Sequence, residues 1–202
     1  MSFNQSESNS KGKILVFSAA SGAGKTTVLN HLREKMPRLV YSISATTRQP
    51  RSHEKNGVHY FFMTIEEFKN KIKNNKFAEW AEVHGNYYGT PKKFIDDTIT
   101  SGRNIIMDID VLGKKKLDIS YPEAVGIFIS PPSMKELEKR LYRRKTDSED
   151  IIKIRLLNAE KEIAFAKEHG NYEYNIENDC LEKTFAEAVS LVKRIIAQDK
   201  TV

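Results

Sequence analysis

Short apolar runs alternate along the chain with longer segments in which apolar residues recur every three or four positions. Runs that suit buried strands occur at 13–18, 39–43, 104–108, 125–129 and 174–176. The first of them leads into a segment with helical spacing, 26–35, which Pro37 ends. Strands that alternate with helices favour a parallel sheet covered by helices on both faces. The pattern therefore predicts an α/β fold.

Segment 45–98 departs from this alternation, because its apolar positions alternate with polar ones and include many aromatic residues. Turn-forming and helix-capping residues divide it further. The expected elements are strands at 60–62 and 77–83, a turn at 85–89, and helices capped by Thr64 and Thr90. The segment therefore predicts a lobe inserted into the parallel-sheet core.

The last third of the chain predicts three helices. Ser133 with Glu136 forms a capping box for the first, and Asp147 or Ser148 caps the second. The third presents one apolar face made of Leu181, Phe185, Val189, Val192 and Ile196.

The length of 202 residues suits one domain with smaller lobes. The first residues are polar and rich in Ser and Asn, which predicts a disordered tail. We expect a tail at 1–11 and one domain at 12–196, with a core (12–44, 99–132 and 161–196), an inserted lobe (45–98) and a helical lid (133–160).

The composition narrows the class of protein. No apolar stretch approaches the roughly 20 residues of a membrane-spanning helix, and no secretory signal precedes the domain, so we expect a cytoplasmic protein without membrane contact. The single cysteine, Cys180, excludes an internal disulfide. The net charge is +6, but the arginines gather in two groups, near Arg48 and near Arg144. Guanidinium groups at defined points suit small phosphates better than nucleic acid.

A glycine-rich turn follows the first strand and opens the first helix. In this context the pattern G-x-x-x-x-G-K-[ST] is a P-loop, whose backbone N–H groups and lysine hold the phosphates of a nucleotide. Gly24-Lys25-Thr26 fit the pattern, while Ala19 replaces its first glycine. The expected ATP-binding residues are Ala19, Ala20, Ser21, Gly22, Ala23, Gly24, Lys25 and Thr26.

Asp108 ends the apolar strand at 104–108. P-loop kinases place at this point an acid that orients Mg²⁺, usually through water. An acid at a strand end can instead cap the next helix. We expect Mg²⁺ as cofactor, with Thr26 and Asp108 as its protein contacts.

Several further motifs occur in the order typical of one family. They are Ser42 to Arg51 with Glu54, Gly57 and Tyr60, then Glu79-Trp80, Gly85 to Gly89, and Asp108-Ile109-Asp110. With the P-loop, they strongly resemble guanylate kinases over nearly the whole chain, from about Gly12 to Ile196. The resemblance implies a P-loop core flanked by helices, a GMP-binding lobe and a lid.

The resemblance also implies which residues bind GMP. It gives Arg48, Arg51, Tyr60 and Tyr88 as ligands of the GMP phosphate, and Ser44, Glu79 and Asp110 as readers of guanine. Two guanidinium forks and two phenols suit a phosphate dianion. One carboxylate can accept hydrogen bonds from both N1–H and the exocyclic amine of guanine, a pair that adenine lacks. GMP, and with it dGMP, is the expected acceptor.

The helices that follow Ser133 match the family's lid. The resemblance implies that Arg140, Arg144 and Arg155 act with Lys25 in catalysis, and that Asn178 contacts the adenine end of ATP. Arg143 is interpreted as a solvated neighbour. A closing lid would neutralise charge on the transferred phosphoryl group and exclude water.

Two other functions stay open. A guanylate kinase-like interaction module would keep the fold with weak catalysis, although this chain retains Lys25, Thr26, Arg144 and Arg155 and shows no further module. A kinase for another small phosphate, such as a ribose bisphosphate, fits less well with Ser44 and Glu79. The sequence leaves the choice between monomer and homo-oligomer open.

Overall fold

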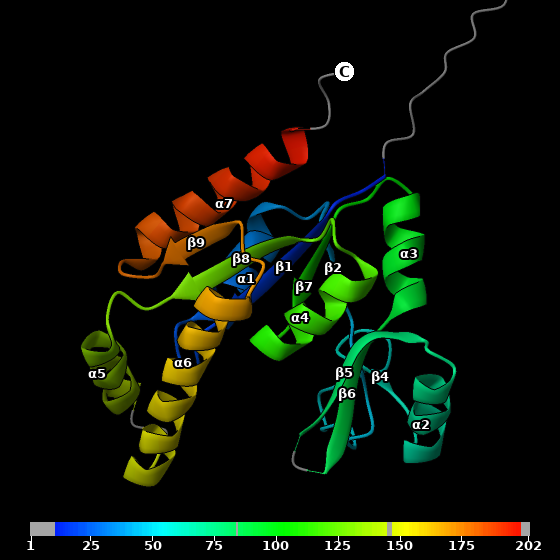
Figure 1. Ribbon diagram of the computed structural model, residues 1–202, viewed down its shortest axis with the longest axis horizontal. Coiled ribbons are helices and arrows are strands. Elements are labelled where there is room, and N and C mark those ends of the chain that lie inside the picture. The colour runs from blue at the N-terminus through cyan, green and yellow to red at the C-terminus, as the bar shows by residue number, and fades with distance from the viewer. Residues whose placement is uncertain (1–10, 84, 145–146, 199–202) are drawn as a thin grey trace, which may run out of the picture.

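The computed structural model describes residues 11–83, 85–144 and 147–198 (Figure 1). Almost all of the tail expected at 1–11, and Lys145 and Thr146 of the expected lid, lie outside these ranges. Within them no helix is long and apolar enough to cross a membrane.

The core is a sheet in which every strand pairing is parallel. From one edge to the other, its strands are β2 (Val40–Tyr41), β7 (Ile105–Asp108), β1 (Ile14–Ala19), β8 (Val125–Ser130) and β9 (Tyr174–Glu177). Each coincides with an apolar run of the sequence, and the expected α/β class is confirmed.

Alternate residues of β1 supply the two sides of the core. Leu15 and Phe17 are fully buried on the side of α1 (Lys25–Lys35) and α7 (Leu181–Ala197). Ile14 and Val16 are buried with residues of two other helices, α3 (Lys92–Thr100) and α4 (Val111–Ser120). Since both faces of the strand are buried, its run is continuously apolar. Figure 1 shows helices on both faces of the sheet.

A second, four-stranded sheet lies within segment 45–98. Its order is β4 (Phe61–Phe62), β3 (Ala45–Thr46), β6 (Asn86–Pro91) and β5 (Phe77–Val83). Helix α2 (Ile65–Lys73) packs on it through the buried Phe68, whose ring stacks on Phe77 with centroids 4.3 Å apart. The capping box of Thr64 and Glu67 is present. In the lower half of Figure 1, α5 (Met134–Arg144) and the start of α6 (Glu149–His169) lie at the left, opposite this second sheet. Ser148 caps α6.

Two local expectations in this segment are wrong. The turn expected at 85–89 is the start of β6, because residues 86–91 find their partners along β5 and only Gly85, with φ 74°, keeps a turn conformation. Thr90 does not cap a helix, since it still lies in β6 and Pro91 occupies the capping position of α3.

Helix α4 was not expected from the sequence. Its pattern contains Gly113 and three successive lysines, but tertiary packing buries Val111 and Leu117. The face of α7 also differs, because Leu181 is 47% exposed while Thr184 and Ala188 are buried. At both helices, tertiary contacts override the helix propensity and the apolar periodicity of the sequence.

Candidate active site

The P-loop joins the end of β1 to the start of α1. Gly22 and Gly24 have φ angles of 84° and 97°, the region that favours glycine. Ala19 is the last residue of β1, and among the described residues only Asn75 is a non-glycine with positive φ. An alanine in place of the first glycine therefore causes no backbone strain here.

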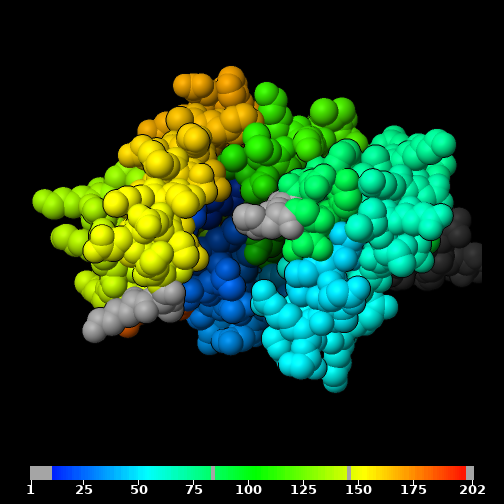
Figure 2. All heavy atoms as spheres, turned by 90° about the horizontal axis from the view of Figure 1, so that it is seen from below, coloured from blue at the N-terminus to red at the C-terminus, as the bar shows by residue number. Residues whose placement is uncertain are grey.

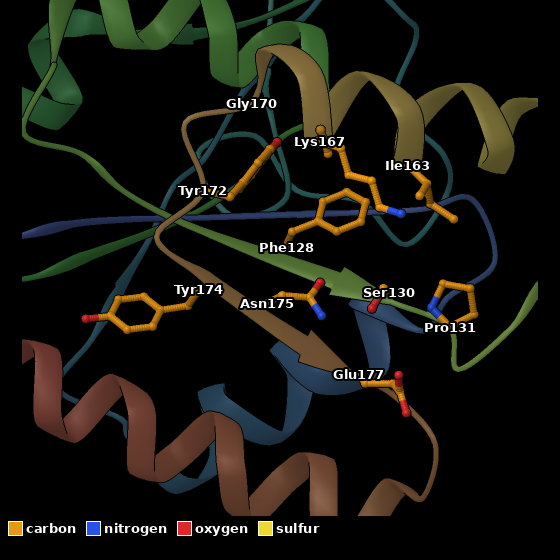
Figure 3. A pocket seen from close by; sticks show the side chains of 11 residues that line it. Phe128, Ser130, Pro131, Ile163, Lys167, Gly170, Tyr172, Tyr174, Asn175 and Glu177 are labelled. Atoms are coloured by element: carbon orange, nitrogen blue, oxygen red, sulfur yellow. The ribbon is translucent and has the colours of Figure 1, made fainter.

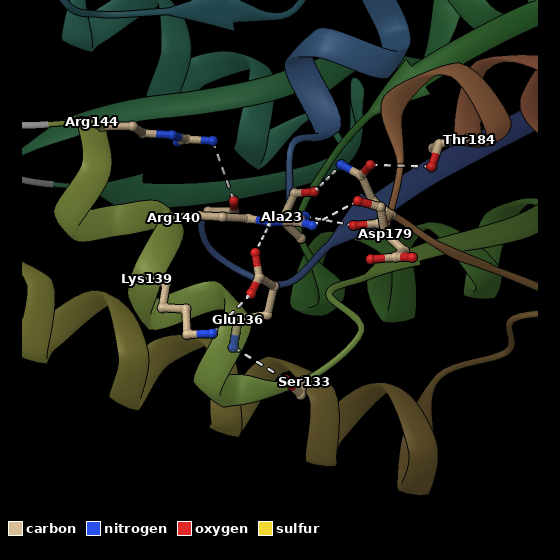
Figure 4. Close-up of polar contacts among 10 residues, drawn as sticks. Ala23, Ser133, Glu136, Lys139, Arg140, Arg144, Asp179 and Thr184 are labelled. Carbon is tan, nitrogen blue, oxygen red and sulfur yellow. Dashed lines mark hydrogen bonds and ion pairs between the residues drawn. The ribbon is translucent and has the colours of Figure 1, made fainter.

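Two side chains from distant parts of the chain hold the loop. Asn178 is buried, and its amide donates to the carbonyl of Ala23 at 2.7 Å and accepts from the hydroxyl of Thr184 at 3.1 Å (Figure 4). A Cβ at Gly24 would lie 2.5 Å from the Asn178 amide nitrogen. From α6, the Glu162 carboxylate accepts the N–H of Ser21 at 2.7 Å. The loop is thus held without a ligand.

Lys25, the first residue of α1, forms an ion pair with Asp108, the last residue of β7. Lys25 also donates to the carbonyl of Ile109 at 3.4 Å. Asp108 is not the cap of the helix after it, because Asp110 accepts the N–H of Gly113 at 2.7 Å and caps α4. The helix cap is therefore Asp110. The Asp108 side chain is 49% exposed.

Thr26 and Asp108 line one cavity of about 190 Å³ together with Ser44 and Tyr60. Mg²⁺ in nucleotide kinases takes one or two carboxylates, substrate phosphates and several waters rather than a cage of protein ligands. Among the described residues no group of three or more His, Cys, Asp or Glu could hold a metal ion by itself. One hydroxyl and one carboxylate beside a P-loop fit a metal that the nucleotide carries.

Arg48 lies in a cluster of aromatic and acidic side chains. Its guanidinium pairs with Glu54 at 2.8 Å and lies 5.5 Å from the ring centroid of Tyr60, whose ring meets that of Tyr88 edge-on at 6.2 Å. Glu54 also accepts the backbone N–H of Arg51 at 2.7 Å. These contacts lower the pKa of Glu54 to about 2, first through the hydrogen bond from Arg48. Arg48 and the backbone of Arg51 thus meet at the Glu54 carboxylate, with Tyr60 and Tyr88 beside Arg48.

Glu79 lies on β5 and is largely buried. It accepts the hydroxyl of Thr90 at 2.7 Å, and a Cβ at Gly113 would lie 3.3 Å from both Glu79 and Asp110. Two of the three expected base readers, Glu79 and Asp110, are therefore neighbours at the start of α4. Burial, the largest effect, and the negative charge of Asp110 both raise the pKa of Glu79.

The lid arginines are held by different partners. Arg140 donates to the carbonyls of Asn178 and Asp179, at 2.5 and 2.8 Å (Figure 4). Arg144 reaches the carbonyl of Gly22 in the P-loop at 3.5 Å. Arg155, on α6, pairs with Asp147 at 3.3 Å. In this conformation α5 is tied to the P-loop and to the end of β9.

A cavity of about 420 Å³ lies between α5 and the P-loop. It is lined by Gly22, Gly24 and Asn178 on one side and by the arginines of α5 on the other. Arg143 is exposed, as expected of a solvated neighbour, but it also lines this cavity beside the P-loop.

Not every large cavity belongs to the candidate site. A separate cavity of about 520 Å³ lies between β8, β9 and α6, with Phe128, Tyr172 and Lys167 on its walls (Figure 3). None of the expected site residues lines it. By contrast, Figure 2 shows a hollow between α6, in yellow, and the lobe, in cyan and green. The floor of this hollow is blue, the colour of the first described residues of the chain. That hollow is the candidate active site.

Comparison with known proteins agrees with these features. A model of the family described as guanylate kinase matches residues 11–199. This chain belongs to the guanylate kinase family. A guanylate kinase of Shouchella clausii is 44% identical over 189 residues, 94% of this chain and 89% of that protein. One of Bartonella henselae is 47% identical over 186 residues, 92% of this chain and 80% of that protein.

A solved structure of a guanylate kinase from Anaplasma phagocytophilum has the same fold. Its TM-score with this chain is 0.71 at 35% sequence identity, and the match covers 95% of this chain and 89% of that one. The resemblance drawn from the sequence motifs is therefore confirmed at the level of family and fold.

Three residues that the structure brings into the candidate site were not predicted from the sequence to belong to it. Glu54 is part of the family signature and contacts both phosphate-site arginines. Thr90 was expected to be a helix cap and instead contacts Glu79. Glu162 lies 141 positions from the P-loop serine that it contacts, and no local pattern indicates that contact.

The backbone at Ala19 generates a prediction about the P-loop. Ala19→Gly should change the affinity for ATP by no more than about tenfold, which is about 1.4 kcal/mol, because the alanine is already unstrained. The measurement is the KM for ATP of both proteins under one set of conditions. A much larger gain in the variant would show that the loop is impaired as it stands.

Proposed function

We propose that this chain is a guanylate kinase that transfers the γ-phosphoryl group of ATP to GMP, giving ADP and GDP. One observation carries the proposal. Thr26 of the P-loop and Asp108 line the same cavity as Ser44 and Tyr60, so donor and acceptor groups meet at one sheet edge. The similar proteins of Shouchella clausii and Bartonella henselae are both named guanylate kinase.

The donor site is proposed to consist of residues 19–26. The backbone N–H groups of the loop and the start of α1 bind the phosphates of ATP. Lys25 exchanges Asp108 for the β- and γ-phosphates, and its charge offsets the charge that develops during transfer. Asn178 contributes by holding the loop, in addition to the proposed contact near adenine.

We assign the divalent metal of the reaction as Mg²⁺. Thr26 and Asp108 would hold it beside the phosphates, Asp108 through water. When bound, Mg²⁺ neutralises charge on the β- and γ-phosphoryl oxygens.

The acceptor site is proposed to use Arg48, Arg51, Tyr60 and Tyr88 for the phosphate. Glu54 keeps Arg48 extended along the rings of the cluster, and the guanidinium then meets a dianion with its geometry already set. Ser44, Glu79 and Asp110 read guanine. The GMP phosphate is itself a nucleophilic anion, so no general base is needed.

The lid is proposed to be residues 133–160 and to act by closing over the phosphates. Arg144 already lies within reach of the P-loop, whereas Arg155 must leave Asp147 to reach the transferred group. Closure places these cations and excludes water as a competing acceptor. The alternative of an interaction module gains no support from the relatives. A cytoplasmic location and the absence of a nucleic-acid partner remain predictions.

The test is a coupled assay that presents GMP, dGMP, AMP, UMP and CMP separately with ATP and Mg²⁺. GMP should give by far the highest kcat/KM, with dGMP next. A preference for a nucleotide with another base would contradict the assignment of GMP as acceptor. No turnover with any of the five nucleotides would contradict the proposed kinase activity.

Lys25→Ala should lower kcat by on the order of 10³ or more, because it removes a cation from the developing phosphate charge. The measurement is kcat with saturating ATP and GMP, together with Tm. Lys35→Ala, at the exposed end of the same helix, is the control and should be nearly silent. A Lys25 variant with a tenth of normal turnover would contradict the P-loop assignment.

Glu79→Gln should weaken GMP recognition by roughly 1–3 kcal/mol, because one acceptor becomes an amide donor that faces guanine donors. The measurement is kcat/KM for GMP and AMP, with Glu82→Gln on the same strand as control. Since the pKa of Glu79 is raised, and only its ionised form accepts from both guanine donors, the KM for GMP should also rise as the pH falls through that pKa. An unchanged preference for GMP in a folded variant would refute the base-reading role.

Arg144→Ala should lower kcat far more than it weakens GMP binding, because its contact with the phosphoryl group forms in the closed, reacting state. Lys139→Ala is the control, since this exposed cation on the same helix pairs with Glu136, at 3.7 Å, and with no other acid among the described residues. Normal turnover combined with a large loss of GMP affinity would place Arg144 outside the lid.

A further inference from the structure

Glu162 links α6, the helix whose first half belongs to the proposed lid, directly to the P-loop. Its carboxylate, on α6, accepts the N–H of Ser21 at 2.7 Å in a partly buried contact. The family resemblance gives this residue no role. A charge-assisted hydrogen bond from a backbone N–H to a carboxylate is stronger than a neutral one, so the contact fixes the loop against the helix.

Two contacts favour the ionised form of Glu162 in a partly buried position. The pKa of Glu162 is raised, because burial, the largest effect, and the charge of Asp110 outweigh the hydrogen bond from Ser21 and the charge of Lys25, which lower it. Lys25 thus lies close enough to both Glu162 and Asp108 to offset their charges. The negative charge of Glu162 is screened by the same lysine that is proposed to bind ATP.

Helix α6 carries a second residue that matters for the reaction. Arg155 precedes Glu162 by seven positions, which is close to two helical turns, so both lie on nearly the same side, about 10 Å apart along the axis. Arg155 is paired with Asp147 in this conformation. Any shift of α6 relative to the P-loop at Glu162 therefore displaces Arg155 relative to the phosphates.

We infer that Glu162 is a positioning residue for phosphoryl transfer. By holding the N–H of Ser21, it fixes the distance between the loop that binds ATP and the helix that delivers Arg155. The inference rests on the proposed function and deepens it, because it connects the donor site and the lid by one contact.

The first test measures kcat and KM for ATP in Glu162→Ala, Glu162→Gln and the control Glu160→Ala, whose side chain is exposed on the same helix. Glu162→Ala should lower kcat by about 10- to 100-fold, the effect of a small misplacement of catalytic groups, and raise KM by less. Gln keeps an acceptor oxygen for Ser21 and should restore kcat to within about threefold of the wild type. The control should match the wild type, and the Tm values show that each variant folds.

The second test combines Glu162→Ala with Arg155→Ala. If Glu162 acts by placing Arg155, its loss should cost about threefold or less in kcat once Arg155 is gone, because the two changes are not additive. Fully additive losses, or a Glu162→Ala variant with normal kcat, would overturn the inference.

A third measurement does not depend on activity. Hydrogen exchange at the Ser21 amide should be slow in the wild type and in Glu162→Gln, and fast in Glu162→Ala, since the contact protects that N–H. Unchanged protection in Glu162→Ala would show that the contact does not form. Absence of GMP phosphorylation by the wild-type protein would count against the proposed function alone, because the exchange experiment would still report on the contact.

Discussion

Phosphate oxygens require N–H donors and cations that converge on one small volume, and the carboxyl edge of the parallel sheet meets this requirement. The P-loop comes directly after β1, and Asp108 ends the neighbouring β7. Because parallel strands end at the same edge, residues that are 83 positions apart, such as Lys25 and Asp108, form an ion pair. The second sheet and α5 flank this edge, and neither could form the site without it.

The cations that are proposed to bind phosphate are held by internal partners. Arg48 pairs with Glu54, Lys25 with Asp108, and Arg155 with Asp147. These contacts keep flexible side chains near the geometry that a phosphate needs, which lowers the conformational entropy lost on binding. In the proposed reaction the three pairs differ once a phosphate binds, because Glu54 can stay with Arg48, while Lys25 and Arg155 exchange one anion for another. That exchange is how the proposal links nucleotide binding to lid closure.

Much of the fold and of the site chemistry could be predicted from the sequence. Strands such as β1 are marked because both of their faces are buried and their residues are apolar throughout. The P-loop is marked because glycine, lysine and threonine are needed at fixed spacing. Helix α4 was missed because its sequence contains a glycine and a lysine run, and its buried residues are recognisable only once it packs against the sheet. The same packing brings Gly113 beside Glu79, a contact that no local pattern contains.

The sequence by itself determined the strands of the core, the P-loop and the family, since each depends on residue types at short range. The tertiary structure decided which groups meet. It made Asp110 rather than Asp108 the cap of α4, placed Asn178 against Ala23, and brought Glu162 to Ser21. The last two contacts join residues that are far apart in the chain. Their geometry depends on how strands and helices pack, and periodicity along the chain carries no record of it.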